Sequence, residues 1–293
     1  MIYLIQKLIS ESLLSLYPIF IKKIPINLDI QLFTRLLGYS LISLFFISLN
    51  FIKQNLLNKN VIFLGLVTVF HIFFSYNGFK ILDTGISYAL FYTYPIMIII
   101  WNTRKWSIYY ITVLLGIFLL SVDLSNKFYI DSYKFTGIIY ILLAALTEVI
   151  IFYIIRGLDT NNSWNFIFLS YFPALILYLI YLLFFYNNNN KIETIKDKQP
   201  TQPTQPTQPT KIKNNTILYI IIALCFNILV GMIGYYLRFN TIKKLPVIIN
   251  GVLSFFGIIT SYIYGIIFDN NKINFQEIIG IILIIYSNIK LLI

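Results

Sequence analysis

The sequence predicts an all-α integral membrane protein that is built from an internal repeat. Of its 293 residues 58% are hydrophobic and only 11% are charged, whereas a soluble domain carries about 25% charged residues. Apolar runs of roughly 20 residues, the length of a membrane-spanning helix, recur along most of the chain. In addition, two similar helix-turn-helix stretches, residues 73–101 and 232–259, lie in its two halves.

The spacing of marker residues relates these two stretches. Tyr76 lies nineteen positions before Pro95, and Tyr235 lies nineteen positions before Ser254. We therefore divide the chain into a first repeat, residues 1–130, and a second repeat, residues 131–293.

The apolar runs predict about ten transmembrane helices. In chain order they cover residues 2–21, 31–52, 60–79, 84–101, 107–122, 134–155, 164–186, 216–237, 245–267 and 277–292. The fifth and the tenth are short enough to be tilted or shifted in the bilayer.

Residues 187–215 interrupt the second repeat with a run of Asn and repeated Thr-Gln-Pro. This composition cannot bury apolar surface, and the spaced prolines favour an extended, solvated chain. We expect a disordered loop. Its two interpretations are a low-complexity expansion without a task and a docking segment for a partner.

The net charge of +11 would suggest nucleic-acid binding in a soluble protein. Here the basic residues fall in short loops and near helix ends, so we expect them to contact lipid headgroups and predict no nucleic-acid partner. With the N-terminus inside, the inner side carries ten of these Lys and Arg residues, including Arg238 in an inner loop and Lys7 at a helix end, and the outer side carries six. Both termini are therefore predicted to be cytoplasmic. The kind of membrane stays open, a viral or eukaryotic host membrane included.

The chemistry-bearing residues are few. Cys225 is the single cysteine and His71 the single histidine, which argues against a disulfide framework, a histidine metal site and a Cys/His nucleophile pair. No phosphate-binding Gly-rich loop followed by Lys-Ser or Lys-Thr occurs. We predict no catalytic residue, no metal and no cofactor, and therefore no enzyme.

Two carboxylates inside predicted helices are the strongest site candidates. A charge at the middle of the bilayer costs about 2.5–3.5 kcal/mol on insertion scales, so Glu11 and Glu148 need a partner, a proton or water. Glu11 has Lys7 one turn away, and a plain ion pair without a task is its alternative interpretation. Glu148 has no basic residue within one turn. Both are candidates to line a solute cavity and to couple proton movement to transport.

Five further residues are candidates for the cavity wall. Tyr88 and Tyr92 share a face of the fourth helix, and His71, Asn227 and Asn250 lie on stripes of small and polar residues. Aromatic packing is the alternative for the tyrosines, and an interhelical hydrogen bond is the alternative for the other three.

Several short motifs resemble the EamA-like, ten-helix form of the drug/metabolite transporter superfamily. They are LYPIFIK at 16–22, FTRLL at 33–37, YNGFK at 76–80 with Pro95 fifteen residues beyond Lys80, FTG at 135–137 and FQEIIG at 275–280. The chain departs from the family pattern at Gly78, where alanine is usual, and at Ser254, where proline is frequent. It also lacks the Gly-Glu that ends the fourth helix.

The resemblance implies two inverted five-helix repeats around a central cavity, and alternating access of a small organic metabolite. We therefore predict a multi-pass secondary transporter whose partners are the lipid bilayer and a small-molecule solute, with a homodimer as one possible assembly. A non-transporting membrane scaffold derived from this fold is the alternative, and a polytopic membrane enzyme is a weaker one.

Overall fold

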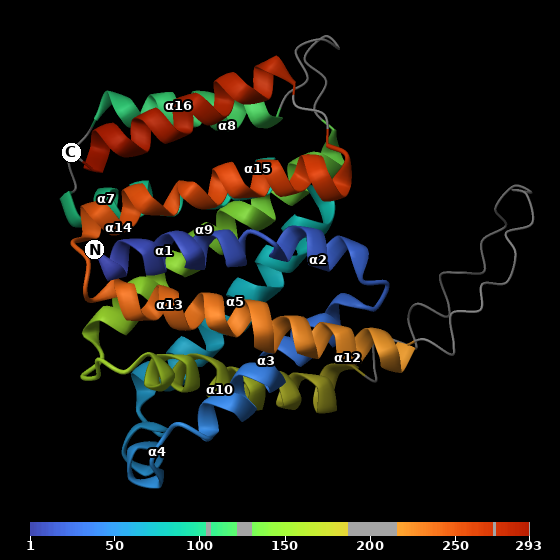
Figure 1. The fold of residues 1–293 in the computed structure, drawn as a ribbon, viewed down its shortest axis with the longest axis vertical. Coiled ribbons are helices and arrows are strands. Elements are labelled where there is room, and N and C mark those ends of the chain that lie inside the picture. Colours follow the sequence, from blue (N-terminus) through green and yellow to red (C-terminus); the bar gives the residue numbers. More distant parts are fainter. Residues whose placement is uncertain (104–106, 122–130, 187–215, 272–273, 293) are drawn as a thin grey trace, which may run out of the picture.

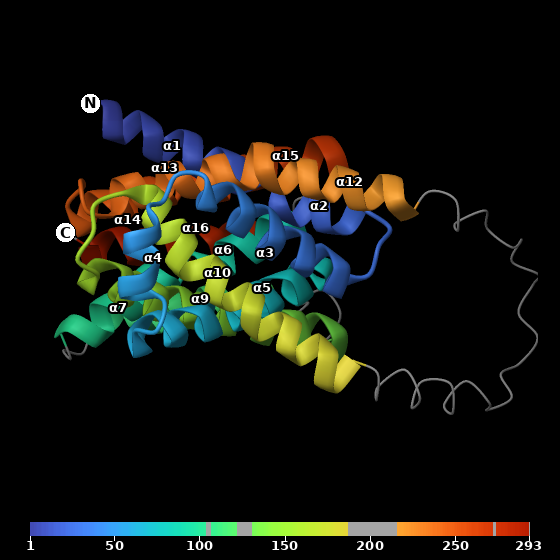
Figure 2. The same ribbon diagram turned by 90° about the horizontal axis from the view of Figure 1, so that it is seen from below.

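The computed structural model describes the chain except for residues 104–106, 122–130, 187–215, 272–273 and 293. The described residues are helical and contain no strand. Figure 1 and Figure 2 show a bundle whose helices run back and forth between two ends. The expected disordered loop at 187–215 lies outside the described residues.

The helices of the first half end before residue 122. They are α1 (Ile2–Leu14), α2 (Tyr17–Lys23), α3 (Leu28–Leu44), α4 (Leu49–Asn55), α5 (Lys59–Ile81), α6 (Thr84–Phe91), α7 (Tyr94–Thr103) and α8 (Ile108–Ser121).

The second half contains further α-helices and two π-helical turns, η2 and η4. They are α9 (Ser132–Gly157), α10 (Ser163–Tyr181), η2 (Leu182–Tyr186), α12 (Thr216–Phe226), η4 (Asn227–Met232), α13 (Ile233–Ile242), α14 (Val247–Ser254), α15 (Phe256–Asp269) and α16 (Phe275–Leu292).

Six helical segments of the described residues are long and apolar enough to cross a membrane. They are Ile2–Lys23, Lys59–Ile81, Ser132–Gly157, Ser163–Phe184, Thr216–Ile242 and Ile249–Asp269. Shorter apolar helices cover Ile108–Leu120 and Phe275–Ser287. The chain is therefore an integral, multi-pass membrane protein.

Four expected helices differ from the structure. Those expected over 2–21 and 245–267 are each divided in two, the first into α1 and α2 and the second into α14 and α15. The one expected over 31–52 ends at Leu44, and a separate short helix, α4, begins after Ser48, whose side chain accepts a hydrogen bond from the backbone N–H of Phe51 at 3.3 Å. The one expected over 84–101 breaks between α6 and α7. Pro95 lacks an N–H and its ring would clash with the carbonyl of residue 91, where α6 ends.

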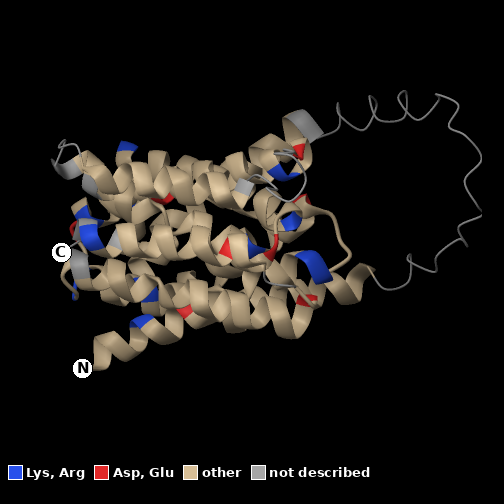
Figure 3. Ribbon diagram, turned by 90° about the horizontal axis from the view of Figure 1, so that it is seen from above, with Lys and Arg blue, Asp and Glu red and all other residues tan. Residues whose placement is uncertain are grey.

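The exterior is apolar and the interior holds polar groups. Large hydrophobic side chains such as Ile217 and Leu229 are exposed on the outside of the bundle, as lipid-facing residues are. Most Lys, Arg, Asp and Glu lie near the two ends of the bundle (Figure 3), and a few lie between them. These few are the charges that need an explanation.

Small residues let some helices approach closely. A Cβ added at Gly65 of α5 would lie 2.7 Å from the Cβ of Pro173 in α10 and 2.9 Å from the backbone nitrogen of Ala174. Gly116 of α8 and Gly280 of α16 face one another in the same way, since a Cβ on either would meet the other's carbonyl oxygen within 3.0 Å. Gly65 thus allows α5 and α10 to pack closely.

The N-terminus and the C-terminal end lie at one end of the bundle (Figure 1). The helical segments that flank residues 187–215 reach the opposite end (Figure 2). The two termini therefore lie on one side of the membrane, and the helix ends next to residues 187–215 lie on the other. Which side is cytoplasmic stays a prediction from the sequence.

Candidate functional site

A buried ion pair joins two helices of the second half. An Nη2 of Arg238 in α13 lies 2.9 Å from Oε1 of Glu148 in α9. Arg238 is 3% exposed and Glu148 is 6% exposed, so each charge has the other as its counterion in a water-poor interior. The assignment of Arg238 to an inner loop was therefore wrong. No cation lies within one turn of Glu148 on its own helix, and its partner comes from another one.

His71 of α5 brings the first half to this pair. Its Nε2 lies 3.7 Å from Oε2 of Glu148, and its Nδ1 lies 3.2 Å from the carbonyl oxygen of Ala144. The hydroxyl of Thr147 already donates to that carbonyl at 2.8 Å and lies 3.1 Å from Nδ1. These acceptors assign the ring hydrogen to Nδ1. Nε2 is then the ring atom that can gain a proton, and it faces a carboxylate oxygen.

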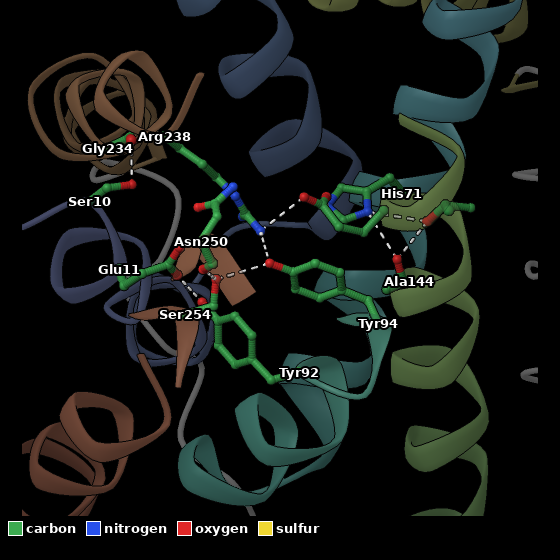
Figure 4. Close-up of polar contacts among 12 residues, drawn as sticks. Ser10, Glu11, His71, Tyr92, Tyr94, Ala144, Gly234, Arg238, Asn250 and Ser254 are labelled. Atoms are coloured by element: carbon green, nitrogen blue, oxygen red, sulfur yellow. Dashed lines mark hydrogen bonds and ion pairs between the residues drawn. The ribbon is translucent and has the colours of Figure 1, made fainter. Parts of the chain in front are cut away.

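Tyr94 and Ser254 extend the network away from Arg238. The guanidinium donates to the Tyr94 hydroxyl at 3.4 Å, and that hydroxyl lies 3.1 Å from Oγ of Ser254 (Figure 4). Ser254 donates to the carbonyl of Asn250 at 2.9 Å. The break between α6 and α7 places Tyr94 here, at the start of α7. The polar network thus crosses from the second half to the first.

A second buried pair lies on α1. Lys7 and Glu11 form an ion pair one turn apart, with exposed fractions of 1% and 0%. Tyr92 donates a hydrogen bond to the Glu11 carboxylate. Gly257 leaves the room for that ring, because a Cβ there would lie 2.7 Å from the Tyr92 hydroxyl oxygen. The Lys7–Glu11 pair expected as one alternative is present, and it is also bonded to Tyr92, the residue that follows α6.

The other predicted residues are buried but lie in different contacts. Tyr88 donates to the carbonyl of Leu14, at the end of α1. Asn227 accepts a hydrogen bond from Tyr17 at 2.9 Å and donates to Thr34 at 3.2 Å. Asn250 is 6% exposed, and its Oδ1 has no hydrogen-bond partner. The structure brings together Glu148 with His71, and Glu11 with Tyr92, whereas Asn227 belongs to a separate network.

The site gathers charged and polar side chains inside the bundle. Among the described residues no group of three His, Cys, Asp or Glu side chains could hold a metal ion. The site instead offers carboxylates, a guanidinium, an imidazole and hydroxyls in a low-dielectric interior, where each polar contact is strengthened. Sequence reasoning missed Arg238 and Tyr94. Arg238 lies one residue beyond the helix expected over 216–237, and Tyr94 is one of 23 tyrosines in the chain.

A multi-pass helical bundle with buried charges at its centre is typical of membrane transport proteins. Residues 135–291, 157 of the 293, match the sequence profile of the EamA-like transporter family. The chain belongs to this family, whose members are membrane transporters.

Comparison with solved structures agrees on the fold. In all, 17 solved chains match. One crystal structure superposes with a TM-score of 0.56 at 13% sequence identity, over 98% of this chain and 96% of its own. No curated protein sequence matches the chain.

Proposed function

We propose that this protein is a secondary transporter that moves a small organic metabolite by alternating access. Family membership supports transport, and one observation carries the mechanism. Glu148, Arg238 and His71 meet inside the bundle, on α9, α13 and α5, so that both halves contribute to one titratable centre. A carrier needs such a centre in the membrane interior, where a change of charge or partner alters the packing of the halves.

We further propose that residues 1–130 and 131–293 form two inverted repeats of five helices. The family match at 135–291 falls within the second of these. Corresponding helices are also broken at related places: α6 gives way to α7 at residues 92–93, and α14 gives way to α15 at residue 255. Discontinuous helices at matching positions of two halves are a feature of transporters, and their substrate sites lie near the breaks.

Contacts at one end of the bundle support a gate. Asp269 of α15 accepts a hydrogen bond from Thr84 of α6 at 2.7 Å, and its Oδ2 lies 3.4 Å from Nζ of Lys22 in α2. First-half and second-half helices are thus joined at the end where residues 187–215 are attached. Alternating access requires these contacts to separate when that end opens.

Glu148 is the proposed proton-coupling residue, with Glu11 second. When Glu148 is ionised it holds Arg238 at 2.9 Å, and when it is protonated that attraction falls. His71 can pass a proton to or from Glu148 because Nε2 is the ring atom nearest to it. Protonation would therefore loosen the contact between α9 and α13 and favour the other access state.

The direct test is solute uptake by the purified protein in proteoliposomes. A panel of organic acids, amines, amino acids and nucleotide sugars is offered with and without a pH gradient. Glu148→Gln is compared with wild type and with Asp159→Asn, which removes an exposed loop carboxylate. We expect uptake of one solute class above protein-free liposomes, and a loss of pH dependence only in Glu148→Gln. Folded protein that transports no solute would favour the scaffold alternative.

A further inference from the structure

The buried charges of the bundle do not balance. Among the described residues the buried cationic side chains are Lys7, Arg35 and Arg238, and the buried carboxylates are Glu11 and Glu148. Lys7 pairs with Glu11, and Arg238 pairs with Glu148. No ion pair of the described residues includes Arg35, which is 2% exposed. One guanidinium is thus buried without a counterion, which is costly in a low-dielectric interior.

Arg35 lies instead inside a cage of tyrosine rings. Its Cζ is 4.6 Å from the ring centroid of Tyr17, 4.9 Å from that of Tyr235, and between 5.6 and 5.7 Å from those of Tyr39, Tyr76 and Tyr171. The rings come from α2, α3, α5, α10 and α13, and so from both halves. Ring faces attract a cation, but they bring no negative charge to cancel it.

Two hydrogen-bond donors of the cage are left without partners. Arg35 donates from Nη2 to the Tyr171 hydroxyl at 3.0 Å, but its Nε has no acceptor. The hydroxyl of Tyr76 also has none. Buried donors without acceptors are rare and costly, so each calls for an explanation, and an acceptor on a bound ion or ligand is one.

The wall of the cage is built at a helix irregularity. The π-helical turn η4, Asn227–Met232, separates α12 from α13, and such turns occur frequently at functional sites. Asn227 of this turn accepts from Tyr17, which in turn contacts the Tyr39 hydroxyl at 2.7 Å. Gly231 of the same turn leaves the space for both hydroxyls, since a Cβ there would overlap them.

We propose that Arg35 and its five tyrosines form a binding site for an oxyanion, namely the carboxylate or phosphate group of the solute. The inference rests on the proposed function, because it names the chemical class of what is carried. A guanidinium presents its N–H donors in a planar fork that fits two oxygens of one oxyanion. Arg35 Nε and the Tyr76 hydroxyl supply donors that are still free, and the ligand supplies the missing negative charge. Access requires α13 to move away from α3, as alternating access provides.

The test is equilibrium binding to the purified full-length protein in detergent, read as the rise of the thermal unfolding midpoint with probe concentration. The probes are benzoate and inorganic phosphate, with benzamide as the neutral and benzylamine as the cationic counterpart. We expect a saturable rise with benzoate, with phosphate or with both, and none with the other two. The oxyanion that raises the unfolding midpoint shows whether the solute carries a carboxylate or a phosphate group.

Three variants locate the site. Arg35→Gln should lower the affinity for the active oxyanion at least tenfold, whereas Arg156→Gln, which removes an exposed arginine of α9, should leave it unchanged. Tyr76→Phe keeps the ring and removes a hydroxyl that donates to no acceptor, so it should weaken binding while the unfolding midpoint without probe stays close to the wild-type value. This variant decides the question if Arg35→Gln does not fold.

Equal responses to all four probes, no response to either oxyanion, or wild-type affinity in both Arg35→Gln and Tyr76→Phe would overturn the proposal. Because binding can be measured without transport, failure of this inference and failure of the proposed function give different results. Oxyanion binding without uptake would contradict only the proposed function, and uptake by a protein that binds no oxyanion would contradict only this inference.

Discussion

At the scale of single residues, Arg238 and Glu148 depend on each other. Removing one member of a buried ion pair leaves an uncompensated charge and costs about 3–5 kcal/mol, whereas removing both can be nearly neutral. We expect Arg238→Gln to lower the thermal unfolding midpoint in detergent strongly. The double variant Arg238→Gln with Glu148→Gln should recover much of the loss. Arg156→Gln is the control for losing an exposed arginine. A double variant less stable than either single one would show that the two residues are not coupled.

The sequence identified the residues of the site better than their partners. Glu11 and Glu148 stand out because a carboxylate in an apolar run is expensive and therefore rare. The residues around Glu148 could not be predicted from the sequence, because His71 and Arg238 lie on other helices and far from Glu148 along the chain. Arg238 resembled a loop residue only because its helix was expected to end at residue 237. The segment extends to Ile242 and places Arg238 inside.

At the scale of the helices, close packing of α5 against α10 gives a matched pair of substitutions. Gly65→Ala would force a Cβ to within 3 Å of Pro173 and of the backbone of α10, which cannot move as a flexible side chain can. Overpacking of this kind costs about 1–3 kcal/mol. We expect a lower unfolding midpoint for Gly65→Ala, measured in detergent.

Gly157→Ala is the control for that substitution, because no atom lies within 4 Å of a Cβ added there. Alanine also has the higher helix propensity, so its midpoint should stay the same or rise slightly. Equal losses in the two variants would mean that the α5–α10 contact contributes nothing specific.

Hydropathy was enough to predict that the helices exist, but it did not predict where they are interrupted. A continuous helix over 84–101 fits the apolar run, and Pro95 was the available signal for its interruption between α6 and α7. The break between α14 and α15 has no proline at the corresponding residue, Ser254, so no local rule marks it. At this break Ser254 lies 3.1 Å from the hydroxyl of Tyr94, which belongs to the other half of the chain.

At the scale of the whole molecule, the two termini lie at one end of the bundle, and the Lys and Arg count predicts that both are cytoplasmic. Two of the ten inner residues, Arg238 and Lys7, are buried in ion pairs and leave the count, so the majority becomes eight against six. We expect an epitope inserted within 201–210 to be reached by antibody only from the outer or lumenal face of intact vesicles. Detection only from the cytoplasmic face would reverse the orientation, and detection from both would indicate dual insertion.

The Thr-Gln-Pro tract is predicted to be dispensable. It has only to connect the helices on either side of it, and the cost of closing a loop changes by about 0.6 kcal/mol for each doubling of its length. Deleting residues 199–210 should leave membrane expression and solute uptake at wild-type levels, with replacement of the same residues by Gly-Ser repeats as the control. Loss of uptake in the deletion alone would mean that length matters. Loss in both would assign a role to the sequence itself.

Composition was enough to predict the class of the molecule, and short motifs were enough to predict its family. A chain with 11% charged residues cannot form an ordinary soluble domain, and apolar runs of about 20 residues are typical of membrane-spanning helices. The network around Glu148 and the cage around Arg35 could not be predicted in this way. They depend on contacts among helices far apart in the sequence, and periodicity does not report such contacts.

Proton movement that accompanies solute uptake tests the central claim most directly. Proteoliposomes hold a trapped pH-sensitive dye and receive a gradient of the transported solute without an imposed pH gradient. The account predicts a solute-dependent change of internal pH for wild type and for Asp159→Asn. For Glu148→Gln it predicts no such change, whether or not solute still enters. A pH change of wild-type size in Glu148→Gln would contradict the assignment of proton coupling to the buried centre.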